Sequence, residues 1–149
     1  MDDLDNKMII GDDRLPQYFN TRDEYDECKE VKVYDQKLCD SAWAFSTSGM
    51  LADRFCYQSK GQIKVDLSAQ DMVNCNFENK GCNGGQINIG LNYLIDEGTT
   101  ADSCNAYTSE IAKCDWECDT VPNRRYKEKY EKFYCKPNSF KIETEINKI

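Results

Sequence analysis

The clearest hydrophobic pattern in the chain runs from Ser41 to Tyr57, where apolar and small residues recur at helical spacing. Asp40 or Ser41 can cap the start of this predicted helix. The helix is apolar on most faces, which predicts a buried helix rather than an amphipathic one. The positions that define its repeat are Ala42, Phe45, Gly49, Ala52 and Cys56.

Two further segments have the pattern of helices. Ser68 is the expected N-cap of a short helix with Gln70 and Asp71 in its first turn. Residues 86–96 form the third predicted helix, and Gly98 is expected to end it. The apolar positions of the third helix are Ile87, Leu91, Tyr93, Leu94 and Ile95.

The remaining segments predict loops with little regular structure. Residues 81–85 hold three glycines and are expected to form a loop, and residues 99–125 are interpreted as a loop held by cysteines. Residues 133–135 and 139–142 can begin strands, and residues 143–149 can begin a helix. The mixed charges of residues 124–132 predict a solvated face.

Length and charge restrict the class of protein. A chain of 149 residues that is 40% hydrophobic predicts one folded domain. Its formal net charge of −8 argues against nucleic acid or an anionic membrane surface as partner. No apolar run is long enough to cross a bilayer, and the acidic start Met1–Asp5 lacks the features of a signal peptide.

Nine cysteines predict disulfide bonds and an oxidising compartment. The chain has no histidine and no Cys-x-x-Cys pair, so neither a metal site nor another cofactor is expected. Because disulfides conflict with the missing signal peptide, we expect Met1 not to be the natural start of the ancestral precursor. A signal peptide and a propeptide would then lie upstream.

Five motifs occur in one order along the chain. They are Leu15–Arg22, the Cys39–Trp43 segment Cys-Asp-Ser-Ala-Trp, the Leu67–Cys75 segment, Gly-Cys-Asn-Gly-Gly at 81–85, and Cys104–Tyr107. Together they resemble the papain family of cysteine peptidases, in particular its cathepsin B-like members. The resemblance extends over residues 15–149.

The resemblance implies an α+β fold of the papain-like type. Its mainly helical, disulfide-stapled left domain would be present, and its right β-domain would be largely missing. Residues 1–14 would be a flexible acidic lead-in, the remnant of the junction between propeptide and mature enzyme, and residues 15–149 a truncated peptidase domain.

The resemblance also implies which cysteines pair. The expected disulfides are Cys28–Cys56, Cys39–Cys82, Cys75–Cys114 and Cys104–Cys118, a connectivity that sequence alone cannot select. Cys135 is left over. It is either free or bonded to a missing segment or another chain.

At the active-site motif, the resemblance places Ala42 where the nucleophilic cysteine belongs. A methyl group cannot attack a peptide carbonyl. The family's histidine and asparagine lie roughly 130–150 residues further on, beyond Ile149. Gln36 matches the glutamine that donates to the oxyanion, and Asp40 replaces a family glycine and adds opposing negative charge.

The resemblance assigns peptide contacts to the glycine loop. Gly84 and Gly85 would let an extended peptide approach and pair with the backbone, and Gln86 and Ile87 would lie near a side-chain pocket. Trp43, which borders the catalytic group in active relatives, is expected here to be mainly core.

We therefore predict a papain-family homologue without catalytic power. Its expected partners are an extended peptide, a peptidase inhibitor or a complementary right-domain chain. Two alternatives remain: a fragment of an active peptidase completed by missing sequence, or a non-catalytic structural or interaction module. The family predicts a lysosomal, vacuolar or extracellular location.

Overall fold

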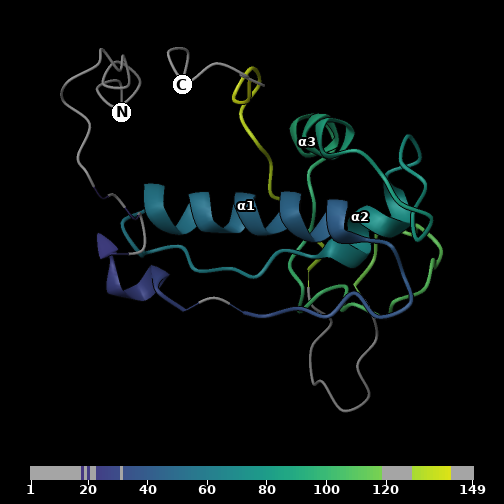
Figure 1. The fold of residues 1–149 in the computed structure, drawn as a ribbon, viewed down its shortest axis with the longest axis horizontal. Coiled ribbons are helices and arrows are strands. Elements are labelled where there is room, and N and C mark those ends of the chain that lie inside the picture. Colours follow the sequence, from purple (N-terminus) through teal and green to yellow (C-terminus); the bar gives the residue numbers. More distant parts are fainter. Residues whose placement is uncertain (1–17, 19, 21–22, 31, 119–128, 142–149) are drawn as a thin grey trace.

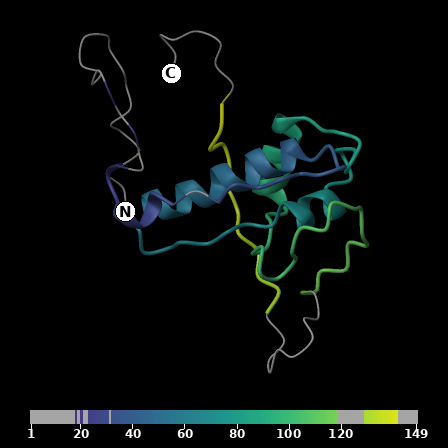
Figure 2. The same cartoon turned by 60° about the horizontal axis from the view of Figure 1, so that its bottom comes forward.

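The computed structural model describes residues 18, 20, 23–30, 32–118 and 129–141. In these ranges the chain forms the 3-10 helix η3 (Asp26–Cys28) and the helices α1 (Ala42–Gln58), α2 (Ala69–Cys75) and α3 (Ile87–Asp96). Both α2 and α3 pack against the N-terminal half of α1, whereas η3 lies near its C-terminal end (Figures 1 and 2). None of the described helices combines the length and apolar character needed to cross a membrane.

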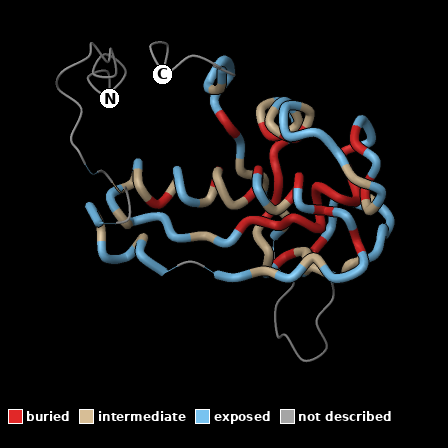
Figure 3. Tube along the Cα trace, in the orientation of Figure 1, coloured by how far each residue is buried: buried red, intermediate tan, exposed pale blue. Residues whose placement is uncertain are grey.

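The core lies where the first half of α1 meets α2 and α3 (Figure 3). Beyond Leu51 only Cys56 of α1 is buried, and Asp53 and Arg54 are exposed. The expectation of a helix buried on most faces is therefore correct as far as Leu51 and wrong beyond it. The buried core consists of Cys39, Trp43, Ala44, Leu51, Leu67, Ala69, Met72, Val73, Leu94 and Cys135.

The predicted ends of α2 and α3 are present. The Ser68 hydroxyl accepts a hydrogen bond of 2.9 Å from the backbone N–H of Asp71, which caps α2. Gly98 follows α3 with φ +68°, and its N–H donates to the carbonyl of Tyr93 at 3.0 Å. Glycine occupies this left-handed conformation without steric cost, so the helix ends where the sequence predicts.

Strand pairing among the described residues is limited to three isolated bridges. One of them joins Thr99 to Phe133 with hydrogen bonds of 3.0 and 2.7 Å. The strand expected at residues 133–135 is therefore reduced to one antiparallel bridge. The other, expected at 139–142, is wrong for residues 139–141, which are irregular. Residues 1–14 and 142–149 lie outside the described ranges.

Four disulfides link the described segments: Cys28–Cys56, Cys39–Cys82, Cys75–Cys114 and Cys104–Cys118. These are the pairs that the resemblance implies. Each removes conformational freedom from the unfolded chain and contributes about 2–4 kcal/mol. Cys135 is a buried free thiol whose pKa is raised by burial.

A buried ion pair joins α2 to the segment after residue 128. The Nζ of Lys132 lies 3.0 Å from Oδ2 of Asp71, and the two side chains are 8% and 1% exposed. The Tyr130 hydroxyl donates to Oδ1 of the same carboxylate at 2.7 Å, and the Thr99 hydroxyl donates to Oδ2 at 3.2 Å. The prediction of a solvated face is thus wrong at Lys132, which turns inward to neutralise a buried charge. Residues 124–128 lie outside the described ranges.

Replacing Lys132 by Met should lower the free energy of unfolding by about 3 kcal/mol, because the Asp71 carboxylate would stay buried without its cation. Urea unfolding with the disulfides intact measures this loss. The matched control is Lys129→Met, at an exposed lysine of the same segment, which should change stability by less than about 0.5 kcal/mol. Equal losses in the two variants would refute a structural role for the ion pair.

Candidate functional site

Ala42 is the first residue of α1 and is exposed. The carbonyl of the preceding Ser41 accepts hydrogen bonds from the N–H groups of Ala44 and Phe45, at 2.9 and 3.1 Å, and so starts the helix. The N–H of Ala42 belongs to the first turn, which has no intrahelical acceptor, and none of the described residues accepts a bond from it. Position 42 therefore presents a methyl group and a backbone donor to solvent.

Ser41 occupies the N-cap position, but its hydroxyl does not cap the helix. It donates to the carbonyl of Cys39 at 3.3 Å and contacts the hydroxyl of Tyr107. The expectation of a side-chain cap from Ser41 is therefore wrong, because a tertiary contact with Tyr107 takes the hydroxyl.

Tyr107 positions the turn that precedes α1. Its hydroxyl donates to the carbonyl of Gln36 at 2.8 Å, and its ring packs edge-on against Phe45 with centroids 4.6 Å apart. The Tyr107 hydroxyl thus contacts both Gln36 and Ser41. The sequence indicated this tyrosine only as part of the Cys104–Tyr107 motif. The side-chain Oε1 of Gln36 is buried and has no donor among the described residues.

The glycine loop at residues 81–85 is fastened to the start of α1 at three points. The Cys39–Cys82 disulfide is the first. The N–H of Asp40 donates to the carbonyl of Cys82 at 3.0 Å, and the indole N–H of Trp43 donates to the carbonyl of Gly81 at 3.2 Å. Trp43 is 4% exposed, so its indole lies in the core, on the buried side of the glycine loop.

Gly85 lies against Trp43 and Asn79. A Cβ at position 85 would come within 2.8 Å of Cδ1 of Trp43 and of Oδ1 of Asn79, so no larger residue fits. The residue itself is exposed, and its N–H and C=O make no hydrogen bond to any described residue. An extended chain approaching from solvent could therefore pair with both groups.

Asn79 was not identified from the sequence, yet it holds the far end of the loop. Its Oδ1 accepts from the N–H of Gln86 at 2.8 Å, and its Nδ2 donates to the carbonyl of Gln86 at 3.3 Å. Both bonds go to a residue seven positions later, beyond the span of the turn and capping signals that a sequence shows. The side chain of Ile87, next to Gln86, is 55% exposed at the start of α3.

Asp40 places a carboxylate beside the same loop. Its Oδ2 lies 3.1 Å from the point where a Cβ on Gly84 would stand, and the residue is exposed. Gly84 has φ +91°, a conformation that favours glycine. The structure thus brings Asp40, Ala42, Gly84 and Gly85 into one region around the Cys39–Cys82 disulfide. Among the described residues, no cluster of three or more side chains is arranged to hold a metal ion.

Known proteins match most of the chain. The sequence model described as papain family cysteine protease matches residues 15–149. The chain is 34% identical over 111 residues to Cathepsin B-like CP1 of Giardia intestinalis, covering 72% of this chain and 36% of that protein. It is 36% identical over 91 residues to Cathepsin B-like cysteine proteinase 6 of Caenorhabditis elegans, covering 60% of this chain and 24% of that protein.

The same relationship appears in the fold. Procathepsin B S9 of Trypanosoma congolense superposes with a TM-score of 0.63 at 25% identity, covering 72% of this chain and 39% of that one. This chain spans roughly a third of the length of its curated cathepsin B-like relatives. Three helices and four disulfides without extended strands, in the described part, fit the helical left-domain fragment that the sequence predicts.

Gly85→Ala should destabilise the fold by about 1–3 kcal/mol, because the added methyl group would overlap Trp43 and Asn79. Gly49→Ala in α1 is the matched control. A Cβ at position 49 meets nothing within 4 Å, so the better helix former should raise stability by up to about 1 kcal/mol. Thermal and urea unfolding measure both changes, and a neutral Gly85→Ala would contradict the tight packing of the loop.

Proposed function

Because the chain belongs to the papain family of cysteine proteases, we propose that it binds extended peptides and does not cleave them. The residue that carries the proposal is Ala42, which is exposed at the start of α1. The resemblance of the Cys39–Trp43 segment assigns it to the family's nucleophile position. The methyl group has neither a lone pair nor a titratable proton, so no covalent acyl intermediate can form there.

Two further features support the absence of turnover. The 149 residues include no histidine, so no imidazole of this chain can act as general base. Asp40 adds a carboxylate near the N-terminus of α1, where active relatives would stabilise a developing oxyanion. Negative charge there raises the energy of an oxyanion and opposes the remaining donors, the Ala42 N–H and the Gln36 side chain.

Peptide binding depends on groups that the loss of catalysis leaves in place. Gly85 is exposed, and its N–H and C=O have no partner in the part of the chain that the structure describes. Cys82, Trp43 and Asn79 hold its loop in position. Main-chain pairing with an extended ligand needs this kind of rigid, glycine-lined edge. The exposed Gln86 and Ile87 would contact a side chain of the ligand.

The ligand we propose is an extended peptide segment or an inhibitor that binds in the same extended form. The disulfides suit an oxidising compartment, and cathepsin-like members of the family are lysosomal or secreted. We propose that this protein is likewise lysosomal or secreted.

The chain should show no peptide hydrolysis above background with fluorogenic dipeptidyl substrates, and a thiol-directed epoxide should not label position 42. Ala42→Cys should create an alkylatable thiol but no turnover, because the chain supplies no histidine to deprotonate it. Fluorescence assays and mass spectrometry of the labelled protein measure these outcomes. Hydrolysis by the unmodified chain that the epoxide abolishes would overturn the proposal.

An acetylated pentapeptide amide should shift the backbone amide signal of Gly85 in ¹H–¹⁵N NMR spectra. The same peptide, N-methylated at the residue that pairs with Gly85, should bind on the order of tenfold more weakly, because it loses a backbone hydrogen bond and gains bulk. If the methylated peptide bound equally well, or if only signals distant from residues 84–87 moved, pairing with Gly85 would be excluded.

A further inference from the structure

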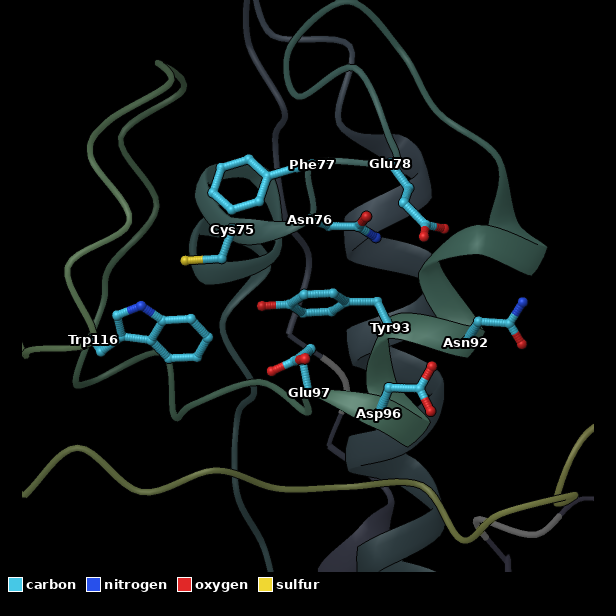
Figure 4. A pocket seen from close by; sticks show the side chains of 9 residues that line it. All are labelled: Cys75, Asn76, Phe77, Glu78, Asn92, Tyr93, Asp96, Glu97 and Trp116. Carbon is cyan, nitrogen blue, oxygen red and sulfur yellow. The ribbon is translucent and has the colours of Figure 1, made fainter.

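A cavity of about 280 Å³ lies between the C-terminal end of α2, one face of α3 and the loop that carries Trp116 (Figure 4). None of its lining residues belongs to the candidate peptide site. The Cys75–Cys114 disulfide ties the α2 end of the cavity to a residue two positions before Trp116. The walls of the cavity are therefore held by this disulfide as well as by the packing of the helices.

Aromatic side chains form the walls of this cavity. Tyr93 projects from α3 between Trp116 and the end of α2, and Phe77 lies above it (Figure 4). Phe77 and Trp116 are 81% and 49% exposed, so part of each ring faces solvent, although Trp116 also packs edge-on against Tyr130 with centroids 6.3 Å apart. Burial, with smaller contributions from Asp71 and Glu97, raises the pKa of Tyr93, which keeps its hydroxyl neutral at physiological pH. Neutral aromatic faces attract cations.

Three carboxylates surround the opening on the side of α3. Glu78, Asp96 and Glu97 line the cavity and are exposed, and in Figure 4 Glu78 lies above Tyr93 whereas Asp96 and Glu97 lie below it. None of the three forms an ion pair with another described residue. The local charge is negative on a chain that is already at −8, so an anionic ligand is disfavoured here.

Lys132 shows that the aromatic groups of this region accommodate a cation. Its Nζ lies 4.6 Å from the ring centroid of Trp116 and 5.5 Å from that of Tyr93. The charge of this ammonium is already neutralised by the Asp71 carboxylate, whose Oδ2 lies 3.0 Å from Nζ. It therefore leaves the charge of the three rim carboxylates uncompensated.

An independent feature of the cavity wall is Asn76, which is 3% exposed. Its Oδ1 accepts from the N–H of Asn79 at 3.3 Å, which fixes the orientation of the amide. Its Nδ2 is buried and has no acceptor among the described residues. In Figure 4 the amide lies between Glu78 and Tyr93. A buried donor without an acceptor costs about 1–3 kcal/mol, which a ligand carbonyl at this wall would recover.

From these groups we propose that the cavity binds an arginine side chain presented by a peptide segment of another protein. The planar guanidinium stacks on the exposed side of Trp116, away from Lys132, and pairs with Glu97 at the rim. A backbone carbonyl of the same segment accepts from Nδ2 of Asn76. A volume of about 280 Å³ is small for a ligand site and suits one long side chain.

The test uses the peptide acetyl-Gly-Arg-Gly-amide and its citrulline analogue, which has nearly the same shape without the charge. The chain has two tryptophans, so their indole N–H signals in ¹H–¹⁵N spectra separate this cavity from the core. The arginine peptide should shift the signals of Trp116 and of the Asn76 side chain and leave that of the buried Trp43 in place. It should bind on the order of fivefold more tightly than the citrulline peptide.

Glu97→Gln should weaken binding of the arginine peptide about threefold. Glu24→Gln is the matched control: it removes one exposed carboxylate ahead of η3 and should leave binding unchanged. Equal affinity for the citrulline peptide, an unaffected Glu97→Gln variant, or shifts at the Gly85 amide in place of Trp116 would each overturn the proposal. The last result would assign the arginine peptide to the other site, so the two proposals fail separately.

Discussion

The fold depends on how the buried charge of Asp71 is compensated. This carboxylate lies inside α2 at 1% exposure, where an unpaired charge would cost several kcal/mol. The carboxylate accepts hydrogen bonds from Lys132, Tyr130 and Thr99, which belong to two other segments. These bonds hold residues 99 and 130–132 against α2. Thr99 in turn forms the bridge to Phe133, and Cys135 donates its N–H to the carbonyl of Leu94 at 2.9 Å. One buried acid thus organises how the late part of the chain crosses the helical core.

The peptide site rests on a separate set of contacts. The Cys39–Cys82 disulfide, the Trp43–Gly81 hydrogen bond and the Asn79–Gln86 pair place the glycine loop beside the start of α1. None of these contacts involves the side chain at position 42, which is exposed. The contacts of the loop therefore do not depend on which side chain occupies position 42. This separation is the physical reason why the proposed peptide binding needs no nucleophile.

The chain therefore carries two surfaces of different chemistry. At Gly85 the glycine loop offers an N–H and a C=O without a partner among the described residues, which would suit an extended main chain. The cavity between α2 and α3 offers aromatic side chains and three carboxylates, which would suit a single cationic side chain.

The sequence by itself determined the elements whose signals lie within a few neighbouring residues. Helical spacing placed α1 and α3 within one residue of their observed bounds, and Ser68 and Gly98 marked ends whose hydrogen bonds lie within a few residues. The motifs also identified the family. Tertiary structure alone decided the rest. Lys132 turns inward to a partner that lies 61 residues earlier, and the Ser41 hydroxyl contacts Tyr107, 66 residues away, and does not cap its own helix. A charged or polar side chain adopts the conformation in which it meets its lowest-energy partner. When that partner is distant in the sequence, no local pattern can predict it, because only folding brings the two residues together.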